Sequence, residues 1–174
     1  MATVSVLAAA ALISAPSSHA GPYPVYDTMR DTVQYLINKY DIDQVLVRME
    51  PMDLNDYAYS QGITITFNSL LVTNPALLES NMADAVGSGW IPGGCGAAQT
   101  VAIHETAHVL DYVTGYTAHQ EAMAAYGGQE VSLSGYSFKD GYVDLDEALA
   151  NAMVAVECGT ATPLEADLHR MLTT

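Results

Sequence analysis

Basic side chains are scarce in this chain. Lys and Arg contribute 5 of the 174 residues, against 20 Asp and Glu, so the formal net charge is −15. Proteins that bind duplex nucleic acid need clustered cations, and an anionic lipid surface repels a chain of this charge. We therefore expect neither nucleic acid nor a membrane surface as a partner. Hydrophobic residues make up 50% of the chain, which excludes wholesale disorder and is enough for the core of one domain.

The N-terminal region lacks an apolar run long enough to cross a bilayer, so no stable membrane insertion is expected. Residues 4–14 are uncharged but too few for a transmembrane helix. The small-x-small pattern Ser18-His19-Ala20 follows, which is typical of a secretory signal cleaved after Ala20. Residues 1–20 contain no Lys or Arg, so the basic start of such a signal is missing, and a buried alanine-rich helix is the alternative. We expect a signal peptide over 1–20, a single domain over 21–174, and a secreted or extracytoplasmic protein; a phage- or cytoplasm-associated protein is the alternative.

Cysteine is nearly absent. The two cysteines, Cys95 and Cys158, form no C-x-x-C motif and do not have the spacing of a metal site. A secreted chain permits one disulfide between them. Two separate small buried residues are the other interpretation. The sequence leaves both open.

Hydrophobic periodicity predicts more helices than strands. Helices are expected over residues 25–40, 76–86, 100–113, 118–126, 145–157 and 163–171, and strands over residues 44–49 and 62–67. Asn74-Pro75 marks the start of the second helix, and Asp144 is the expected N-cap of the fifth. Because both strands lie in the first half of the chain, the pattern indicates an α+β fold.

The helix expected over residues 100–113 contains an H-E-x-x-H motif. It consists of His104, Glu105 and His108, with Thr106-Ala107 between the glutamate and the second histidine. Positions i and i+4 share one helix face, so both imidazoles can bind one ion, and neutral imidazole suits zinc. Glu105 starts about 100° around the helix and can reach a metal-held water without binding the metal, as a general base must.

A third metal ligand has to come from elsewhere in the chain. Thr114 occupies the position of the third metzincin ligand, and Pro163 that of the aspzincin aspartate, so both patterns fail. An acidic residue on a later helix remains. Glu147 is the first choice, because the small residues after it let two helices approach closely. Asp144 and Asp146 compete with it as ligands.

Three segments together resemble a known group of metallopeptidases. They are His104-Glu105-Thr106-Ala107-His108, Ser134-Gly135-Tyr136 and Glu147-Ala148-Leu149-Ala150. This pattern is similar to the gluzincin metallopeptidases of the anthrax lethal factor type, and it resembles the zincin-like domains attached to phage head-morphogenesis proteins and to bacterial toxins. The strand at 62–68 is similar to the strand before the active-site helix in such domains. The resemblance covers residues 45–157.

The resemblance implies a zincin-like fold, in which a small mixed sheet is followed by an active-site helix and a C-terminal helical part. It also implies that His104, His108 and Glu147 hold Zn²⁺, that Glu105 activates water, and that Tyr136 donates its hydroxyl to the oxyanion. The expected function is zinc-dependent hydrolysis of a peptide bond in a peptide or protein substrate. A non-catalytic zincin-like binding or structural protein is the alternative.

Several side chains outside the motif carry weaker expectations. Tyr142 lies closer to Glu147 in sequence than Tyr136 does and is the alternative oxyanion donor. The strand at 63–67 alternates cleanly, and we expect its edge to pair with an extended substrate. His169 is expected to be solvated, and Trp90 to plug the core.

Overall fold

The computed structural model describes residues 23–174, and the fold is a mixture of helices and small sheets. The α+β class expected from the sequence is therefore confirmed. The predicted signal segment lies outside the described residues. Within residues 23–174, no helix has both the length and the apolar character needed to cross a membrane.

Helices dominate the described part of the chain. They are α1 (Pro24–Tyr40), α2 (Ser69–Val72), α3 (Pro75–Gly87), α4 (Ala97–Val113), α5 (Thr117–Tyr126), α6 (Leu145–Glu157), α7 (Pro163–Thr173) and a 3-10 turn, η1 (Gly135–Ser137). All six predicted helices are present with boundaries within a few residues. The short helix α2 was not predicted.

Two caps explain where helices begin. The Asn74 side chain accepts a hydrogen bond from the Leu77 N–H at the start of α3, and Thr162 and Glu165 form a capping box at the start of α7. The expectation for Asp144 is only half right. It occupies the N-cap position of α6, but its side chain makes no capping hydrogen bond.

A three-stranded sheet lies beside the helices. Its strands are β1 (Leu46–Glu50), β2 (Ala58–Gln61) and β3 (Thr64–Asn68), in the order β1-β3-β2, with β1 parallel and β2 antiparallel to β3. A tight turn at Gly62, which has a φ of +59°, joins β2 to β3. A two-stranded ribbon, β4 (Phe138–Lys139) with β5 (Tyr142–Val143), precedes α6.

The sheet order corrects the expectation about substrate pairing. The strand predicted over residues 62–67 is β3, which is hydrogen-bonded on both sides and cannot accept another strand. The outer strand next to it is β2, which the sequence did not reveal because Ala58–Gln61 has no strong apolar alternation. Any strand addition on that side would have to use β2.

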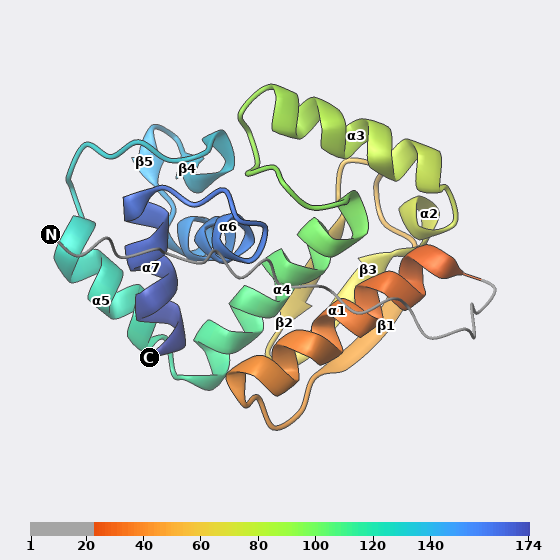
Figure 1. The fold of residues 1–174 in the computed structure, drawn as a ribbon, viewed down its shortest axis with the longest axis horizontal. Helices are drawn as coiled ribbons and strands as arrows, with labels where there is room; N and C mark the ends of the chain where they lie inside the picture. Colours follow the sequence, from red (N-terminus) through yellow and green to blue (C-terminus); the bar gives the residue numbers. More distant parts are fainter. Residues whose placement is uncertain (1–22) are drawn as a thin grey trace, which may run out of the picture.

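Helix α4 runs through the middle of the molecule (Figure 1). It packs against α1 and the sheet on one side and against α6 on the other. Its buried residues are spread around the helix, as expected for a helix enclosed by protein. The core continues through the largest fully buried side chains: Phe67, Met29, Leu36, Ile65, Leu71, Leu78, Leu149, Met153, Leu168 and Leu172.

The two cysteines are joined. The disulfide between Cys95 and Cys158 ties the glycine-rich loop before α4 to the C-terminal end of α6. Two side-chain expectations are wrong. Trp90 is 48% exposed and does not plug the core, and His169 is partly buried, with its Nε2 2.9 Å from the Tyr40 hydroxyl.

Candidate metal centre

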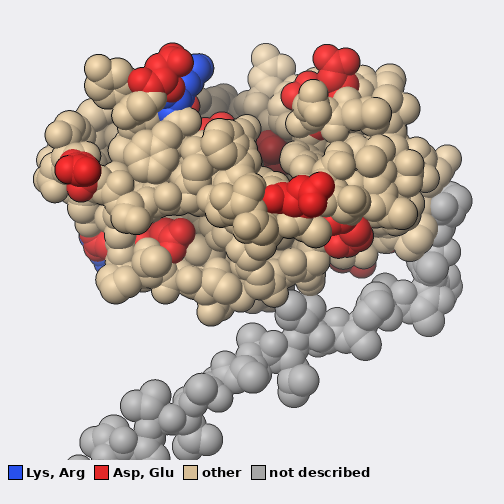
Figure 2. Space-filling model, turned by 90° about the horizontal axis from the view of Figure 1, so that it is seen from above, with Lys and Arg blue, Asp and Glu red and all other residues tan. Residues whose placement is uncertain are grey.

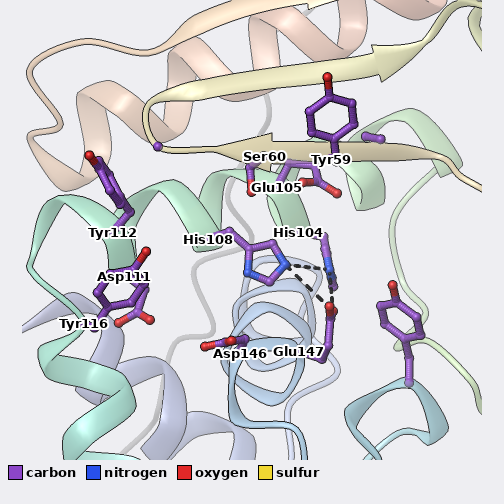
Figure 3. A pocket seen from close by; sticks show the side chains of 13 residues that line it. Tyr59, Ser60, His104, Glu105, His108, Asp111, Tyr112, Tyr116, Asp146 and Glu147 are labelled. Carbon is purple, nitrogen blue, oxygen red and sulfur yellow. Dashed lines mark hydrogen bonds and ion pairs between the residues drawn. The ribbon is translucent and has the colours of Figure 1, made fainter. Parts of the chain in front are cut away.

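Three predicted ligands meet between α4 and α6. His104 and His108 come from successive turns of α4, and Glu147 comes from the first turn of α6. In Figure 3 the three side chains point toward one another. The Nε2 atoms of the histidines are 3.2 Å apart, and Glu147 Oε2 lies 3.0 Å from His104 Nε2 and 3.8 Å from His108 Nε2.

These separations fit one tetrahedral ion. Ligand bonds of about 2.0–2.1 Å around zinc place the ligand atoms about 3.4 Å apart. The three distances between the donor atoms of His104, His108 and Glu147, 3.0, 3.2 and 3.8 Å, lie on both sides of this value. The donor set of two imidazoles and one carboxylate is also one that zinc prefers, and it leaves a fourth position for water.

Small residues bring the two helices together. Ala148, Ala150 and Ala152 are completely buried where α6 packs against α4 and its neighbours. The resulting close approach allows the short Glu147 side chain to reach imidazoles on the neighbouring helix. This is the packing that the sequence predicted. Of the competing acids, Asp146 points instead to His119, and Asp144 is not part of the ligand group.

The pKa values of all three candidate ligands are shifted from their ordinary values. Burial lowers the pKa of His104, but the Glu147 carboxylate and Glu105 outweigh it, so the pKa is raised overall. Burial, followed by the charge of His104, lowers the pKa of His108 to about 4. Burial raises the pKa of Glu147, but the neighbouring His104 outweighs it and lowers the pKa overall. Because imidazole must be neutral to bind a metal, an ion would displace the His104 proton.

Glu105 is buried beside the ligands without joining them. It is 6% exposed, and its Oε2 atom has no hydrogen-bond partner in the described part of the chain. Burial raises its pKa to about 7, while the positive charge of His104 opposes the shift. A carboxylate with a pKa near neutrality is suited to accept and return a proton.

The structure distinguishes the two candidate tyrosines. The Tyr136 ring centroid lies 5.7 Å from that of His104, whereas Tyr142 is 79% exposed and does not line the clefts around the site. Burial and the charges of Glu147 and Glu105 raise the pKa of Tyr136 to about 12, so its hydroxyl keeps its proton at neutral pH. Of these two tyrosines, only Tyr136 lies beside the candidate ligands.

The loop that contains Gly89 and Trp90, here called the Trp90 loop, holds Tyr136 in place. The Tyr136 N–H donates to the Trp90 carbonyl, and the Gly135 N–H donates to the Gly89 carbonyl, both at 2.9 Å. The Trp90 indole covers Gly135 so closely that an added Cβ would lie 2.5 Å from the ring. A larger residue at position 135 would therefore displace the Trp90 ring.

Asn151 supports the site and was missed by the sequence analysis. It follows Glu147 by one helical turn and is 1% exposed. Its amide nitrogen donates to the hydroxyls of Ser134 and Ser137 at 3.0 and 3.2 Å, which fixes the amide. The Asn151 side-chain oxygen makes no other hydrogen bond among the described residues and remains available to His104. The Asn151 side chain accordingly raises the pKa of His104. A lone polar residue in the apolar run of α6 was the signal that could have identified it.

Clefts extend on both sides of His104. One has a volume of about 370 Å³ and is lined by Ser60 of β2 and by Asp111, Asp146, Tyr112 and Tyr116. The other, of about 400 Å³, is more apolar. It is lined by Met82, Trp90, Ile91 and Val101. Figure 2 shows one hollowed face of the molecule, on which acidic side chains far outnumber basic ones.

No family model, no curated protein and no solved structure matches this chain.

Proposed function

We propose that this protein is a zinc-dependent endopeptidase of the zincin kind, closest in its site to the gluzincins. The observation that carries the proposal is the convergence of His104, His108 and Glu147 at tetrahedral spacing, with the buried Glu105 carboxylate beside them. A purely structural zinc site has no need for such a base. Its buried Oε2 atom has no hydrogen-bond partner among the described residues, and a water molecule or a substrate in the cleft could supply one.

The residues of the chain divide the chemistry among them. Zinc held by His104, His108 and Glu147 would acidify a bound water and polarise the scissile carbonyl. Glu105 accepts the proton of the attacking water and passes it to the leaving amine. The Tyr136 hydroxyl donates a hydrogen bond to the oxygen on which negative charge develops.

The clefts and the outer strand support an extended peptide as substrate. Strand β2 contributes Ala58 and Ser60 to the cleft wall next to Glu105, and among the described strands it pairs only with β3. Its outer edge offers backbone groups to a peptide in the manner of strand addition. The clefts on either side of His104 would then take substrate residues before and after the cleaved bond.

The disulfide supports an extracytoplasmic location, since such bonds persist in oxidising compartments. We therefore keep the proposal of a secreted protein whose mature chain begins at Gly21. The intact mass of exported protein tests it, and retention of Met1 or Ala2 would contradict it.

The test of catalysis is Glu105→Gln. This variant keeps the shape of the side chain but removes the base, so we expect zinc to stay bound and the cleavage of casein or a peptide library to fall about 10²- to 10⁴-fold. Zinc content is measured by native mass spectrometry on the same samples. Equal cleavage by both proteins at equal zinc content would refute the peptidase proposal and favour a zincin-like binding protein.

A further inference from the structure

A second group of metal-ligating side chains lies at the far end of the same cleft. Asp111 is near the end of α4, His119 is in the first turn of α5, and Asp146 is in the first turn of α6. One donor atom from each lies within 4.8 Å of the others. His119 Nδ1 is 2.7 Å from Asp146 Oδ1. In Figure 3, Asp111 and Asp146 lie on the side of His108 that faces away from His104.

Asp146 and Glu147 serve different groups although they are adjacent in sequence. Consecutive residues on a helix point about 100° apart, so one can face His119 while the other faces His104. The contacts follow this division: Asp146 contacts His119, and Glu147 contacts His104 and His108. The second group is therefore separate from the group formed by His104, His108 and Glu147.

Asp111 is a buried carboxylate without a cation. It is 5% exposed, and its hydrogen bond in the described part of the chain comes from the His119 backbone N–H, at 3.4 Å. No Lys or Arg among the described residues forms an ion pair with it. Burying a carboxylate is unfavourable unless a positive charge compensates it, and Asp111 borders the cleft from which such a charge can come.

We propose that Asp111, His119 and Asp146 bind a second divalent cation. One imidazole nitrogen with two carboxylates is a donor set for Zn²⁺ or Mn²⁺, whereas Ca²⁺ and Mg²⁺ favour oxygen alone. With bonds of about 2.1–2.2 Å, two ligands of one ion are roughly 3.0 Å apart at right angles and roughly 4.3 Å apart when opposite. The 2.7 Å contact between His119 Nδ1 and Asp146 Oδ1 therefore has to widen slightly, and separations of up to 4.8 Å in the group have to shorten slightly.

The second ion has a structural consequence. Its ligands come from α4, α5 and α6, so the ion cross-links three helices beside the cleft that Asp111 and Asp146 line. It also neutralises the two acids that otherwise leave this wall negative. This role does not depend on hydrolysis at the first site.

The experiment counts ions in the full chain. Protein freed of metal by chelation is titrated with Mn²⁺ and with Zn²⁺, and bound ions are counted by native mass spectrometry. We expect two ions in the unchanged protein, one in His104→Ala/His108→Ala, and one in His119→Gln. His119 is 32% exposed, so this substitution is compatible with the fold, which circular dichroism verifies. Glu121→Gln on the same helix, outside the group, is the matched control and should keep two.

The ion counts distinguish a failure of the second site from a failure of the first. If one ion binds and only the His104→Ala/His108→Ala change removes it, the second site is wrong and the first stands. If one ion binds and only His119→Gln removes it, the second site stands and the proposed zinc centre is wrong. Two ions in folded His119→Gln would also overturn the second site.

Discussion

Helix α6 has a glutamate near each end. Histidine and tyrosine lie close to both glutamates, but the two carboxylates differ in how completely they are hydrogen-bonded. Glu147, near the N-terminal end, faces two histidines and lies close to Tyr136. Glu157, at the C-terminal end, meets His169, Tyr40 and Lys39. In residue types, either end could be a site with a carboxylate, an imidazole and a phenol.

The C-terminal end is fully satisfied. Both oxygens of Glu157 accept hydrogen bonds from Lys39 Nζ, at 2.7 and 2.9 Å, and Oε1 also accepts one from the Tyr40 hydroxyl. A lysine charge and three hydrogen bonds leave nothing for a ligand to supply. This end ties α1 to α6 and α7, and the disulfide at Cys158 is next to it.

The N-terminal end is less fully satisfied, although Glu147 Oε2 lies 3.0 Å from His104 Nε2. The Oε2 atoms of Glu105 and Glu147 are both buried and make no hydrogen bond of good geometry within residues 23–174. No lysine or arginine pairs with either carboxylate in this part of the chain. The two ends contain similar residue types but differ in how many hydrogen bonds and basic partners their carboxylates have. Buried carboxylate oxygens without such partners are what distinguish the candidate site from the structural cluster.

The largest expected effect comes from removing each glutamate in turn. Residues that only orient a zinc ligand contribute about 10–100-fold to affinity, so the loss of a direct ligand in Glu147→Ala should weaken zinc affinity roughly 100-fold or more, with the fold retained. Glu157→Ala should leave the zinc affinity unchanged and lower the free energy of unfolding by about 2 kcal/mol, since it breaks hydrogen bonds to a charged group. Competition with a chelator measures the affinity, and urea unfolding measures stability.

The opposite pattern would break the comparison. Unchanged zinc affinity in Glu147→Ala would move the third ligand to Asp144 or Asp146, and a loss of zinc in folded Glu157→Ala would show that the C-terminal end also contributes to metal binding.

Removing the disulfide should act only on the structural end. The bond spans 63 residues of sequence, and closing a loop of this size stabilises a fold by about 4 kcal/mol in the chain-entropy model. Cys95→Ser/Cys158→Ser should lose about this much in urea unfolding without metal, while the folded variant binds zinc as before. A loss of zinc affinity at temperatures where the variant is folded would contradict the separation of the two ends.

Substitutions of Asn151 test whether this residue supports zinc binding at the N-terminal end of α6. Partners that orient a ligating histidine typically contribute 10–100-fold to metal affinity, so Asn151→Ala should weaken zinc binding by about this factor. Asn151→Asp retains an acceptor toward His104 and should restore most of the affinity. Equal weakening in both variants would mean that Asn151 acts only by packing.

The smallest expected effect concerns pH at the C-terminal end. Burial is the main cause that lowers the pKa of His169 below its ordinary value of about 6.5, with Glu157 opposing it. The unfolded chain therefore takes up this proton at higher pH than the folded chain, and the free energy of unfolding should fall as pH drops from about 6.5 through the folded pKa. His169→Gln should reduce this slope. Urea unfolding of both proteins from pH 7.5 downward measures it, and identical slopes would contradict the shift.

The helices and the candidate metal ligands could be predicted from the sequence because their signals are local. The spacing of His104 and His108 is fixed by helix geometry, and Asn74 and Pro163 mark helix starts that the structure has. Glu147 could be predicted as the third candidate ligand because the alanines after it indicate close helix packing.

Features that depend on strand order or on distant partners were not readable. The central position of β3 follows from pairing with β2, and no pattern in the sequence of β3 states which strand is outermost. The choice of Tyr136 over Tyr142 depends on the Trp90 loop, far away in sequence. Asp111 could have been noticed, because it lies three residues after His108 and so near the same helix face.

Helix α6 also constrains how this protein can change its length. One residue inserted between Asn151 and Glu157 would rotate the C-terminal end by about 100° and shift it by about 1.5 Å relative to the metal ligand. Either the lysine contact and disulfide or the zinc geometry would then be lost. Insertions and deletions in this lineage should therefore accumulate in loops such as residues 127–133, and the spacing from Glu147 to Cys158 should stay constant.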